Sequence, residues 1–371
     1  YLEDGMVDQR IEKLAELLVH YSLDVQPGHK VFIRSGMTAA PLVAEVYKKC
    51  IEIGAFPFNV FDFPPADEAM YKYGSDEQVS YIHEPTEILY GKYDRMLRIL
   101  AEENTKALSS VDPRKISVFS KARGKLMKVY MDRTARGELK WSLTAFPTQA
   151  YAQDADMSLG EYEDFLYGAC MPDLNDPVGY WKNISREQDR IVKWLKGKKK
   201  VHLVGKDTDL QLSIEGRDFV NCDCRVNIPD GEIFTGPVED SIEGHVSFSY
   251  PTIYMTREVT GVKLTFEKGR VVKASASKNE EFLLNTLETD AGARGVGEFA
   301  IGTNIGIQKF TRQILFDEKI GGSFHMALGA GYPETGSKQQ SAIHWDMICD
   351  LRDGYIKVDG ETLYENGKFV I

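Results

Sequence analysis

KVFIRSGMTAAPLVAEVYKKCIEIGAFPFNVFDF, residues 30–63, contains a strand, a helix and a second strand in that order. Residues 30–34 follow a Pro-Gly turn and read as a short strand. In residues 41–53 apolar side chains recur at helical spacing, and Gly54 ends the pattern. Residues 58–63 are extended in character and stop at two prolines. Strands that alternate with helices predict a parallel sheet covered on both faces.

The same alternation continues along the first half of the chain. Residues 95–100 read as a strand, residues 113–133 as a long basic helix, and residues 140–144 as another strand. We therefore assign residues 1–180 to an α/β domain with a mostly parallel sheet. Its expected role is accessory, in dimer formation or substrate access.

The second half has a different composition. Residues 171–177 are rich in proline, asparagine and aspartate and predict a linker into a short helix at 184–195. Asn279 is placed to cap a helix at 280–287. Short strands separated by Gly, Asp and Asn turns are expected at residues 201–204, 210–214, 262–266, 270–275 and 355–358. Residues 181–371 thus form a predicted α+β domain rich in antiparallel strands.

Charge and composition exclude several classes of partner. A formal net charge of −11 and a pI near 5.3 argue against sequence-independent nucleic-acid binding and against an anionic membrane surface. No apolar stretch approaches the roughly 20 residues of a membrane span, and no signal-peptide pattern is present. Five cysteines without framework spacing fit a reducing cytoplasm best.

The chemistry concentrates in the C-terminal part. On a strand, residues i and i+2 point to the same face, so His344 and Asp346 can bind one ion. Trp345 then points to the opposite face and packs against other side chains. His325 and three acids, Glu232, Glu298 and Glu318, precede this motif. Such a set suits divalent zinc, cobalt, manganese or iron, and its oxygens exceed what one tetrahedral zinc needs. Two adjacent metals, joined by a bridging carboxylate, are the natural inference.

Other residues have weaker signals. Tyr332 could donate a hydrogen bond to an oxyanion, or it could be an ordinary core or turn tyrosine. Cys222 and Cys224 could bind zinc from one face of a strand, although no second Cys or His pair flanks them. Residues 227–237 read as a turn-rich stretch whose backbone could approach a ligand closely. The remaining histidines stand alone and are interpreted as structural: His20, His29, His83, His202 and His245.

Five ordered motifs together resemble the aminopeptidase T and aminopeptidase S family of metalloexopeptidases. They are NIPDGEIF (227–234), GEFAIG (297–302), DEKIGG (317–322), HMALG (325–329) and HWD (344–346). Segments 21–28, 39–54 and 149–167 also resemble the N-terminal domain of that family, so the likeness spans nearly the whole chain. The resemblance implies a two-domain, cytoplasmic, homodimeric enzyme that removes N-terminal amino acids from peptides.

The resemblance also implies roles for particular residues. It matches Tyr332 to the active-site tyrosine and assigns two divalent ions per chain, expected to be zinc, cobalt, manganese or magnesium. We expect Glu298 to bridge them, and Glu318 is favoured over Glu232 as general base if one of the two is not fully engaged by metal. The matched ligands are Glu232, Glu298, Glu318, His325, His344 and Asp346. The segment between Tyr332 and His344 is shorter than the family pattern, which leaves substrate specificity open.

Two other hypotheses remain open at this point. His325, His344 and Asp346 alone would make the two-His-one-carboxylate triad of a non-haem iron oxygenase, and ring-cleaving dihydroxypyridine dioxygenases resemble the same scaffold. A mononuclear iron site has no need of three further acids, which favours the peptidase. A non-enzymatic protein stabilised by metal would bind ions without turnover.

Overall fold

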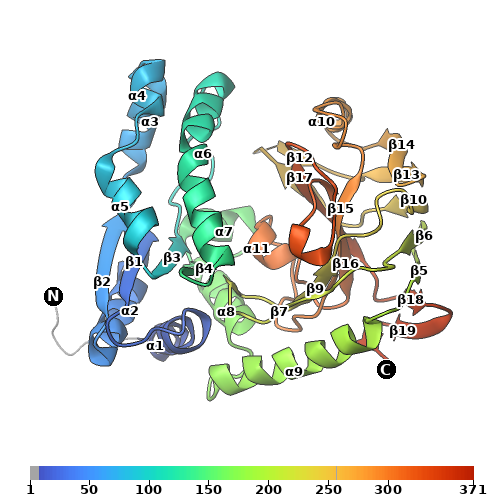
Figure 1. Ribbon diagram of the computed structural model, residues 1–371, viewed down its shortest axis with the longest axis horizontal. Coiled ribbons are helices and arrows are strands. Elements are labelled where there is room, and N and C mark those ends of the chain that lie inside the picture. The colour runs from blue at the N-terminus through green and yellow to red at the C-terminus, as the bar shows by residue number, and fades with distance from the viewer. Residues whose placement is uncertain (1–7, 256) are drawn as a thin grey trace. The chain divides into compact units, whose positions relative to one another are not determined.

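The computed structural model (Figure 1) describes residues 8–255 and 257–371 and contains two compact units. The first unit comprises the described residues up to Val178 together with Cys224–Ile228. The second comprises Gly179–Asp223 and Pro229–Ile371. The five residues Cys224–Ile228 return to the first unit and add a two-residue strand to it. A strand this short gives no recognisable pattern in the sequence.

A five-stranded parallel sheet forms the centre of the first unit. Its order is β2-β1-β3-β4-β8, and each neighbouring pair is parallel. The strands are β1 (Lys30–Ser35), β2 (Phe56–Phe61), β3 (Arg95–Leu100), β4 (Lys140–Ala145) and β8 (Asn227–Ile228). The predicted parallel sheet is therefore confirmed. Strand β2 lies at one edge of the sheet, with alternate side chains exposed.

Helices connect these strands and cover the sheet. They are α1 (Gln9–Glu16), a π-helical turn (Leu17–Ser22), a 3-10 turn (Met37–Ala39), α2 (Ala40–Ile53), α3 (Pro64–Tyr73), α4 (Asp76–Ser80), α5 (Glu84–Lys92), α6 (Pro113–Ala135), α7 (Gln149–Asp154) and α8 (Leu159–Cys170). Helix α1 packs on α2 and α8, whereas α4 and α5 pack on α6. The chain moves outward from β1 to β2 and then back across β1 to β3 and β4. With right-handed crossovers, this reversal places α2 and α6 on opposite faces of the sheet.

The second unit contains two antiparallel sheets and a separate hairpin. The larger sheet, in spatial order, contains β14 (Arg270–Ser275), β13 (Lys263–Glu267), β10 (Glu243–Ser247), β6 (Thr208–Ser213), β5 (Lys200–Gly205), β18 (Tyr355–Val358), β19 (Glu361–Glu365) and β20 (Lys368–Phe369). The smaller contains β17 (His344–Asp350), β16 (Ser323–Gly329), β15 (Val296–Gly302), β9 (Glu232–Thr235) and β7 (Val220–Cys222). The hairpin pairs β11 (Thr252–Tyr254) with β12 (Arg257–Val259). The prediction of a strand-rich antiparallel C-terminal part is confirmed.

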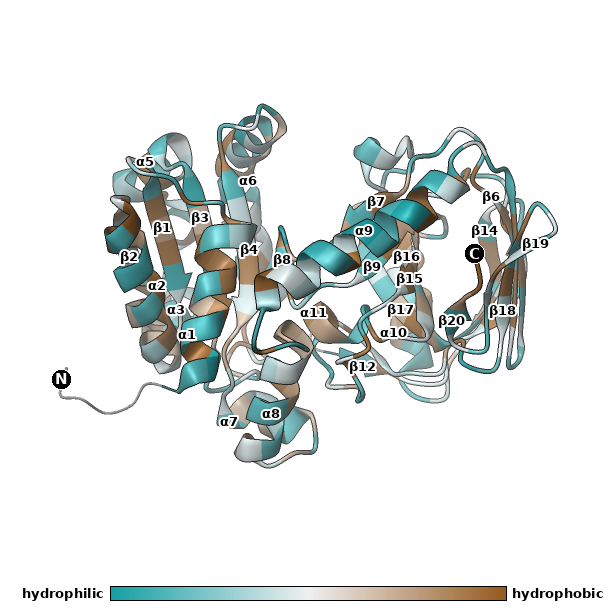
Figure 2. Cartoon of the chain, turned by 90° about the horizontal axis from the view of Figure 1, so that it is seen from below, coloured by the Kyte–Doolittle hydropathy of each residue, from teal (hydrophilic) through white to brown (hydrophobic). Residues whose placement is uncertain are grey.

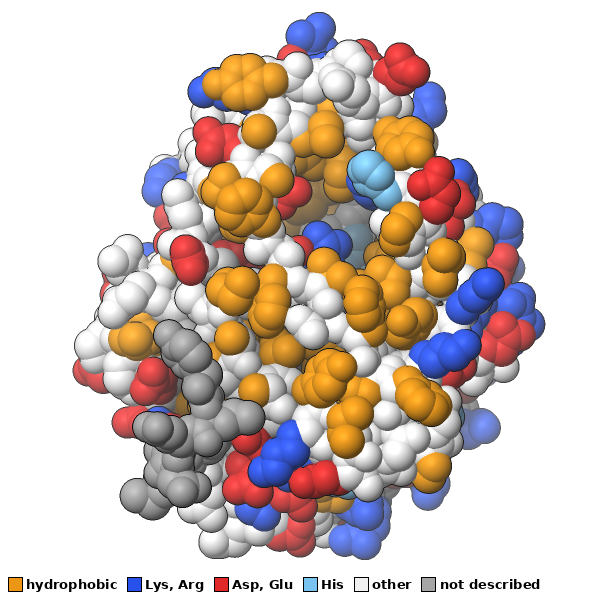
Figure 3. Space-filling view, turned by 90° about the vertical axis from the view of Figure 1, so that its left-hand side faces the viewer, with side chains coloured by type: hydrophobic (Ala, Val, Ile, Leu, Met, Phe, Trp, Pro, Cys, Tyr) orange, Lys and Arg blue, Asp and Glu red, His pale blue; other side chains and the backbone are white. Residues whose placement is uncertain are grey.

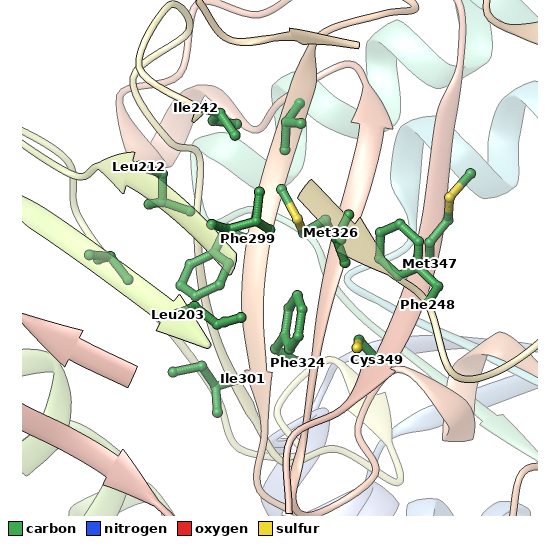
Figure 4. Close-up of a cluster of buried hydrophobic side chains, with 14 of the residues drawn as sticks. Leu203, Leu212, Ile242, Phe248, Phe299, Ile301, Phe324, Met326, Met347 and Cys349 are labelled. Carbon is green, nitrogen blue, oxygen red and sulfur yellow. The ribbon is translucent and has the colours of Figure 1, made fainter. Parts of the chain in front are cut away.

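Apolar side chains from both sheets meet in one core (Figure 4). Leu203 and Leu212 come from the larger sheet, and Phe299, Phe324 and Met326 come from the smaller one; all are buried. Each such side chain contributes about 1.5–3 kcal/mol on removal from water. The smaller sheet therefore has one face committed to the core, which leaves its other face for polar residues.

The helices of the second half differ from the sequence prediction in two places. Helix α9 (Pro177–Leu195) begins seven residues before the predicted start at 184, because proline is well tolerated in the first turn, where its missing N–H would have no helical partner. Asn279 does precede α10 (Glu280–Thr286), but its side chain makes no cap. Its φ of +59° turns the side-chain amide away, and the amide donates to the Glu258 carbonyl oxygen at 2.8 Å instead.

Hydropathy and cysteine chemistry agree with the composition. None of the helices in the described residues is long and apolar enough to cross a membrane, and Figure 2 shows hydrophilic residues along α1, α2 and α9. All five cysteines are thiols that are not joined in disulfides. Cys222 ends β7, whereas Cys224 lies outside that strand with a φ of +69° and belongs to the first unit, so the two are not neighbours on one strand face.

Candidate metal centre

The alternation of side chains along the smaller sheet separates the site from the core. Phe324 and Met326 point into the core, so His325 between them points to the opposite face. The strand register places Asp346 beside Ala327 and His344 beside Gly329 on this same face. Glycine and alanine at these positions leave open space between the polar side chains.

Strand β9 extends this polar face. Glu232 is the first residue of β9 and pairs with Gly302, so the sequence-based prediction of a turn-rich loop at this point is wrong. The turn occupies residues 229–231, and Gly231 has a φ of +112°. A Cβ atom there would lie 2.9 Å from Asn304 Cβ, so glycine allows the close approach that starts the strand.

A β-bulge directs Glu298 into the site. Val296 pairs with Leu328 on the core face, but two residues later Glu298 pairs with Ala327, which lies on the polar face. The extra residue in β15 is Gly297, where a Cβ would lie only 1.9 Å from the Ala330 carbonyl oxygen. Without this bulge the period of two would point Glu298 into the core and Phe299 out of it.

The structure brings the two histidines and their acidic neighbours together. His325 Nε2 lies 3.6 Å from Glu232 Oε2 and 3.4 Å from Glu298 Oε1. His344 Nε2 lies 3.3 Å from Glu298 Oε2 and 3.5 Å from Asp346 Oδ1. The two oxygens of Glu298 therefore face different histidines. Ligand atoms of Glu232, Glu298 and His325 form one compact group, and those of Glu298, His344 and Asp346 form a second.

These separations fit ligands of a shared cation. Two atoms that each bind an ion at about 2.1 Å with tetrahedral angles are about 3.4 Å apart. The four nitrogen-to-oxygen distances of 3.3–3.6 Å lie close to that value. They are longer than ordinary hydrogen bonds between the same atoms. The spacing therefore suits a cation between the groups better than direct contact.

Hydrogen bonds on the far side of each imidazole fix its orientation. His325 Nδ1 lies 2.9 Å from the Glu318 carbonyl oxygen, and His344 Nδ1 lies 2.9 Å from the Ala330 carbonyl oxygen. A carbonyl only accepts, so each Nδ1 carries the proton and donates it. In a neutral ring, Nε2 then presents a lone pair to the carboxylates. This is the usual arrangement of metal-binding histidines.

Two carboxylate oxygens in the site are buried without a donor. Glu232 Oε2 and Asp346 Oδ1 accept no hydrogen bond from the part of the chain that the structure describes. A buried acceptor in this condition costs about 1–3 kcal/mol, and more when it is charged. A bound cation would satisfy both atoms, so the donor set fits divalent metal.

The charged groups of the site shift the pKa values of its histidines and of Glu298 in opposite directions. Burial opposes charge on His325, but the nearby carboxylates of Glu298, Glu232 and Glu318 outweigh burial and raise the pKa of His325. The pKa of His344 is raised in the same way by Asp346 and Glu298. Burial also raises the pKa of Glu298, but both histidines outweigh it and lower that pKa below its usual value. Protons on the two imidazoles thus balance the acids when no ion is present.

Glu318 and Tyr332 border the two groups. Glu318 directly follows α11 (Ile314–Asp317), and one of its oxygens lies in a third compact group with His325 and Asp346. The Tyr332 ring lies 5.2 Å from the His344 ring and 5.3 Å from the Phe234 ring, measured between centroids. Burial and the nearby acids raise the pKa of Tyr332, so its hydroxyl stays protonated as a donor. All seven residues predicted from the sequence therefore lie in or beside one site.

Comparisons with known proteins identify the family. The family of thermophilic metalloproteases (M29) matches residues 7–369 of the 371. The chain belongs to the M29 metalloproteases. The resemblance predicted from the five motifs is therefore confirmed, and the chain is a metal-dependent peptide hydrolase.

Related proteins cover nearly the whole length of the M29 chain. It is 29% identical to aminopeptidase 2 of Geobacillus stearothermophilus, over 96% of this chain and 94% of the relative. It is 26% identical to aminopeptidase T of Thermus thermophilus, over 97% and 96% respectively. The solved structure of wild-type AmpT from Thermus thermophilus has the same fold, with a TM-score of 0.86 and 22% identity over 98% of this chain and 99% of that one.

Neither comparison nor geometry supports the dioxygenase alternative. The relatives reported above are aminopeptidases. Among the described residues, His325, His344 and Asp346 do not meet as one group of ligand atoms, because Glu298 lies between the two histidines. The predicted iron triad is therefore not formed by these side chains.

Lys319 was missed in the sequence, where it reads as an ordinary charged residue. It is fully buried, and its ammonium nitrogen contacts Glu318 Oε1 closely and lies 3.6 Å from Glu232 Oε1. The ammonium thus occupies one oxygen of Glu232, while Oε2 of the same carboxylate faces His325. In the sequence, only the neighbouring acids mark Lys319 as unusual. They do not indicate that its side chain is buried.

Asp230 is a further residue that the sequence did not assign, and Cys222 was considered there only as a partner of Cys224. Their ligand atoms group with one of Glu232, next to the main site. Burial raises the pKa of the Cys222 thiol well above its usual value, so the thiol stays protonated. The five other histidines join none of the ligand groups formed by described residues.

Replacing Lys319 tests its role as counter-ion. Lys319→Met keeps the length of the side chain but leaves Glu232 and Glu318 without their ammonium partner. We expect the metal-free variant to lose about 3–5 kcal/mol of unfolding free energy, the usual cost of breaking a buried ion pair. Urea denaturation of the metal-free proteins measures this loss.

The matched control is Lys273→Met, at an exposed position on β14. It should change stability by no more than about 0.5 kcal/mol. Equal unfolding midpoints for the two variants would contradict the counter-ion role of Lys319.

Proposed function

We propose that this M29 enzyme is an aminopeptidase that releases N-terminal amino acids from peptides with two divalent ions bridged by Glu298. One observation carries the two-metal proposal: Glu298 Oε1 faces His325 and Glu298 Oε2 faces His344. A carboxylate whose two oxygens face different histidines is placed to be shared between two ions. The aminopeptidase activity is supported by the activities named for the full-length relatives.

The proposed ligands divide into two sets. Glu232, Glu298 and His325 would hold one ion, and Glu298, His344 and Asp346 would hold the other. The mixture of imidazole and carboxylate suits zinc, cobalt or manganese, and magnesium would rely on the oxygens. Ions held here would supply a hydroxide nucleophile near neutral pH and Lewis acidity for the peptide carbonyl.

Side chains around the two sets would transfer protons and stabilise the negative charge that develops on the peptide carbonyl oxygen. We assign Glu318 as general base, because Lys319 holds Oε1 and the carboxylate lies against both His325 and Asp346. Tyr332 would donate its phenolic proton to the oxyanion, since its raised pKa keeps the hydroxyl protonated. A fixed donor of this kind is commonly worth 10²–10³-fold in rate, or about 2.7–4 kcal/mol.

The test is hydrolysis of leucine p-nitroanilide together with metal content by mass spectrometry. Chelation should abolish hydrolysis, and zinc, cobalt, manganese or magnesium should restore it as the content approaches two ions per chain. Hydrolysis that survives complete removal of metal would contradict the proposal, and so would full activity at one ion per chain.

Glu298→Gln is the decisive variant in the same assay. It removes the charge of the bridging carboxylate while keeping its shape, so we expect turnover to be abolished and metal content to fall below two, with the fold intact by circular dichroism. Glu281→Gln, at an exposed position on α10, is the control and should behave as the unmodified enzyme. Unchanged activity of Glu298→Gln would show that the site assignment is wrong.

We also propose that the enzyme is a homodimer whose first unit contributes a contact surface. Phe56, Phe58 and Val60 alternate along the edge strand β2 and are 64%, 46% and 38% exposed. Hydrophobic side chains gather on this side of the molecule (Figure 3). A row of exposed apolar residues on a sheet edge usually marks an interface. Five cysteines without a disulfide support a reducing, cytoplasmic location, which cell fractionation would test.

Light scattering measures this association. The unmodified chain should have the mass of a dimer, and Phe56→Asp should shift it toward monomer because a charge would be buried in the contact. Val272→Asp places the same charge on exposed β14 of the second unit and should leave the mass unchanged. A monomeric unmodified chain would contradict the proposal.

A further inference from the structure

A cavity of about 160 Å³ lies beside the metal centre in the second unit. Its wall includes Asp346, one of the proposed metal ligands, and Ile348 two residues further along β17. Because residues i and i+2 share a face of a strand, Ile348 continues the face that carries His344 and Asp346. A group seated in this cavity therefore lies next to the reacting centre.

Four of the remaining wall residues are apolar: Pro251, Ile253, Phe310 and Ile314. Ile253 comes from β11, Phe310 from the loop before α11, and Ile314 from the start of α11. Phe310 is fixed by stacking on Tyr250, with ring centroids 5.4 Å apart. These side chains offer an apolar surface for hydrocarbon groups. They carry no charge that could pair with a charged ligand group.

Three polar residues of the wall, Arg312, Asp317 and Thr252, already have partners. Arg312 Nε lies 3.1 Å from Glu258 Oε2, and Asp317 Oδ1 accepts hydrogen bonds from the Thr311 backbone N–H and hydroxyl. The Thr252 hydroxyl donates to the Asp346 carbonyl oxygen and accepts from Trp345 Nε1. A charged ligand group would have to compete with these contacts, so the cavity disfavours one.

The volume sets the size of the occupant. An apolar cavity of about 150 Å³ is large enough to bind benzene. The 160 Å³ here therefore accepts a leucine, methionine or phenylalanine side chain. An alanine methyl group would leave most of it empty.

We propose that this cavity is the subsite for the side chain of the N-terminal residue, and that the enzyme selects peptides that begin with a large apolar residue. The inference rests on the proposed function, because only an enzyme that cleaves the first peptide bond places that side chain beside the metals. Filling the cavity adds apolar contact that a smaller or charged side chain lacks.

The test compares kcat/KM for p-nitroanilides of leucine, phenylalanine, alanine, lysine and glutamate with the metal-loaded enzyme. Leucine and phenylalanine should exceed alanine by at least about tenfold, since each methylene in a fitted pocket is worth about 10–200-fold. Lysine and glutamate should be poorer still.

Two variants alter the cavity. Ile314 is 43% exposed, so Ile314→Asp should fold normally while adding a negative charge to the wall. We expect it to lower kcat/KM for the leucine substrate about tenfold or more. The ratio of kcat/KM for lysine to that for leucine should rise. Ile253→Trp narrows the cavity, so it should reduce kcat/KM for the phenylalanine substrate more than for the alanine substrate. Val272→Asp, at a 44% exposed position on β14, is the matched control and should keep the original ratios.

The outcomes separate the two proposals. If the unmodified enzyme hydrolyses these substrates but Ile314→Asp and Ile253→Trp leave all ratios unchanged, the cavity is not the subsite while the proposed function stands. Equal kcat/KM values for apolar and charged residues would also overturn the inference. Hydrolysis of none of the five substrates by the metal-loaded enzyme would overturn the proposed function and the subsite together.

Discussion

The two-sided character of the smaller sheet is the constraint on which the rest of the structure depends. Phe299, Phe324 and Met326 bury one face against the larger sheet, and this burial fixes the register of β15 and β16. Once the register is fixed, the residues between them must point the other way. A slip of one residue would bury His325 in the apolar core, so the energy that stabilises the fold also positions the proposed metal ligands.

The concentrated negative charge on the polar face requires cations. Glu232, Glu298, Glu318 and Asp346 lie close together with little access to water. Lys319 supplies one fixed positive charge, and the two imidazoles take up protons when no metal is bound. Burying several unpaired carboxylates would cost more than the fold can supply. Two divalent ions would balance the four acids, which explains why so many acids can share one face.

Much of this organisation could be predicted from the sequence. The strand-helix alternation of residues 30–63 specified the parallel sheet, and the HWD spacing placed His344 and Asp346 on one face of β17. The bulge at Gly297 could not be predicted, because an extra residue in a strand looks like any other residue until its partner strand is known. Lys319 and the strand position of Glu232 were missed for the same reason: burial and register are properties of the assembled sheet, not of a local segment.

Anomalous diffraction from crystals of the enzyme loaded with zinc or cobalt tests the central claim most directly. The account predicts two peaks per chain, one among Glu232, Glu298 and His325 and one among Glu298, His344 and Asp346, with one oxygen of Glu298 bound to each ion. Two-metal hydrolytic sites place their ions about 3.5–4 Å apart. A single fully occupied peak, or two peaks that do not share Glu298, would contradict the bridging role of that carboxylate.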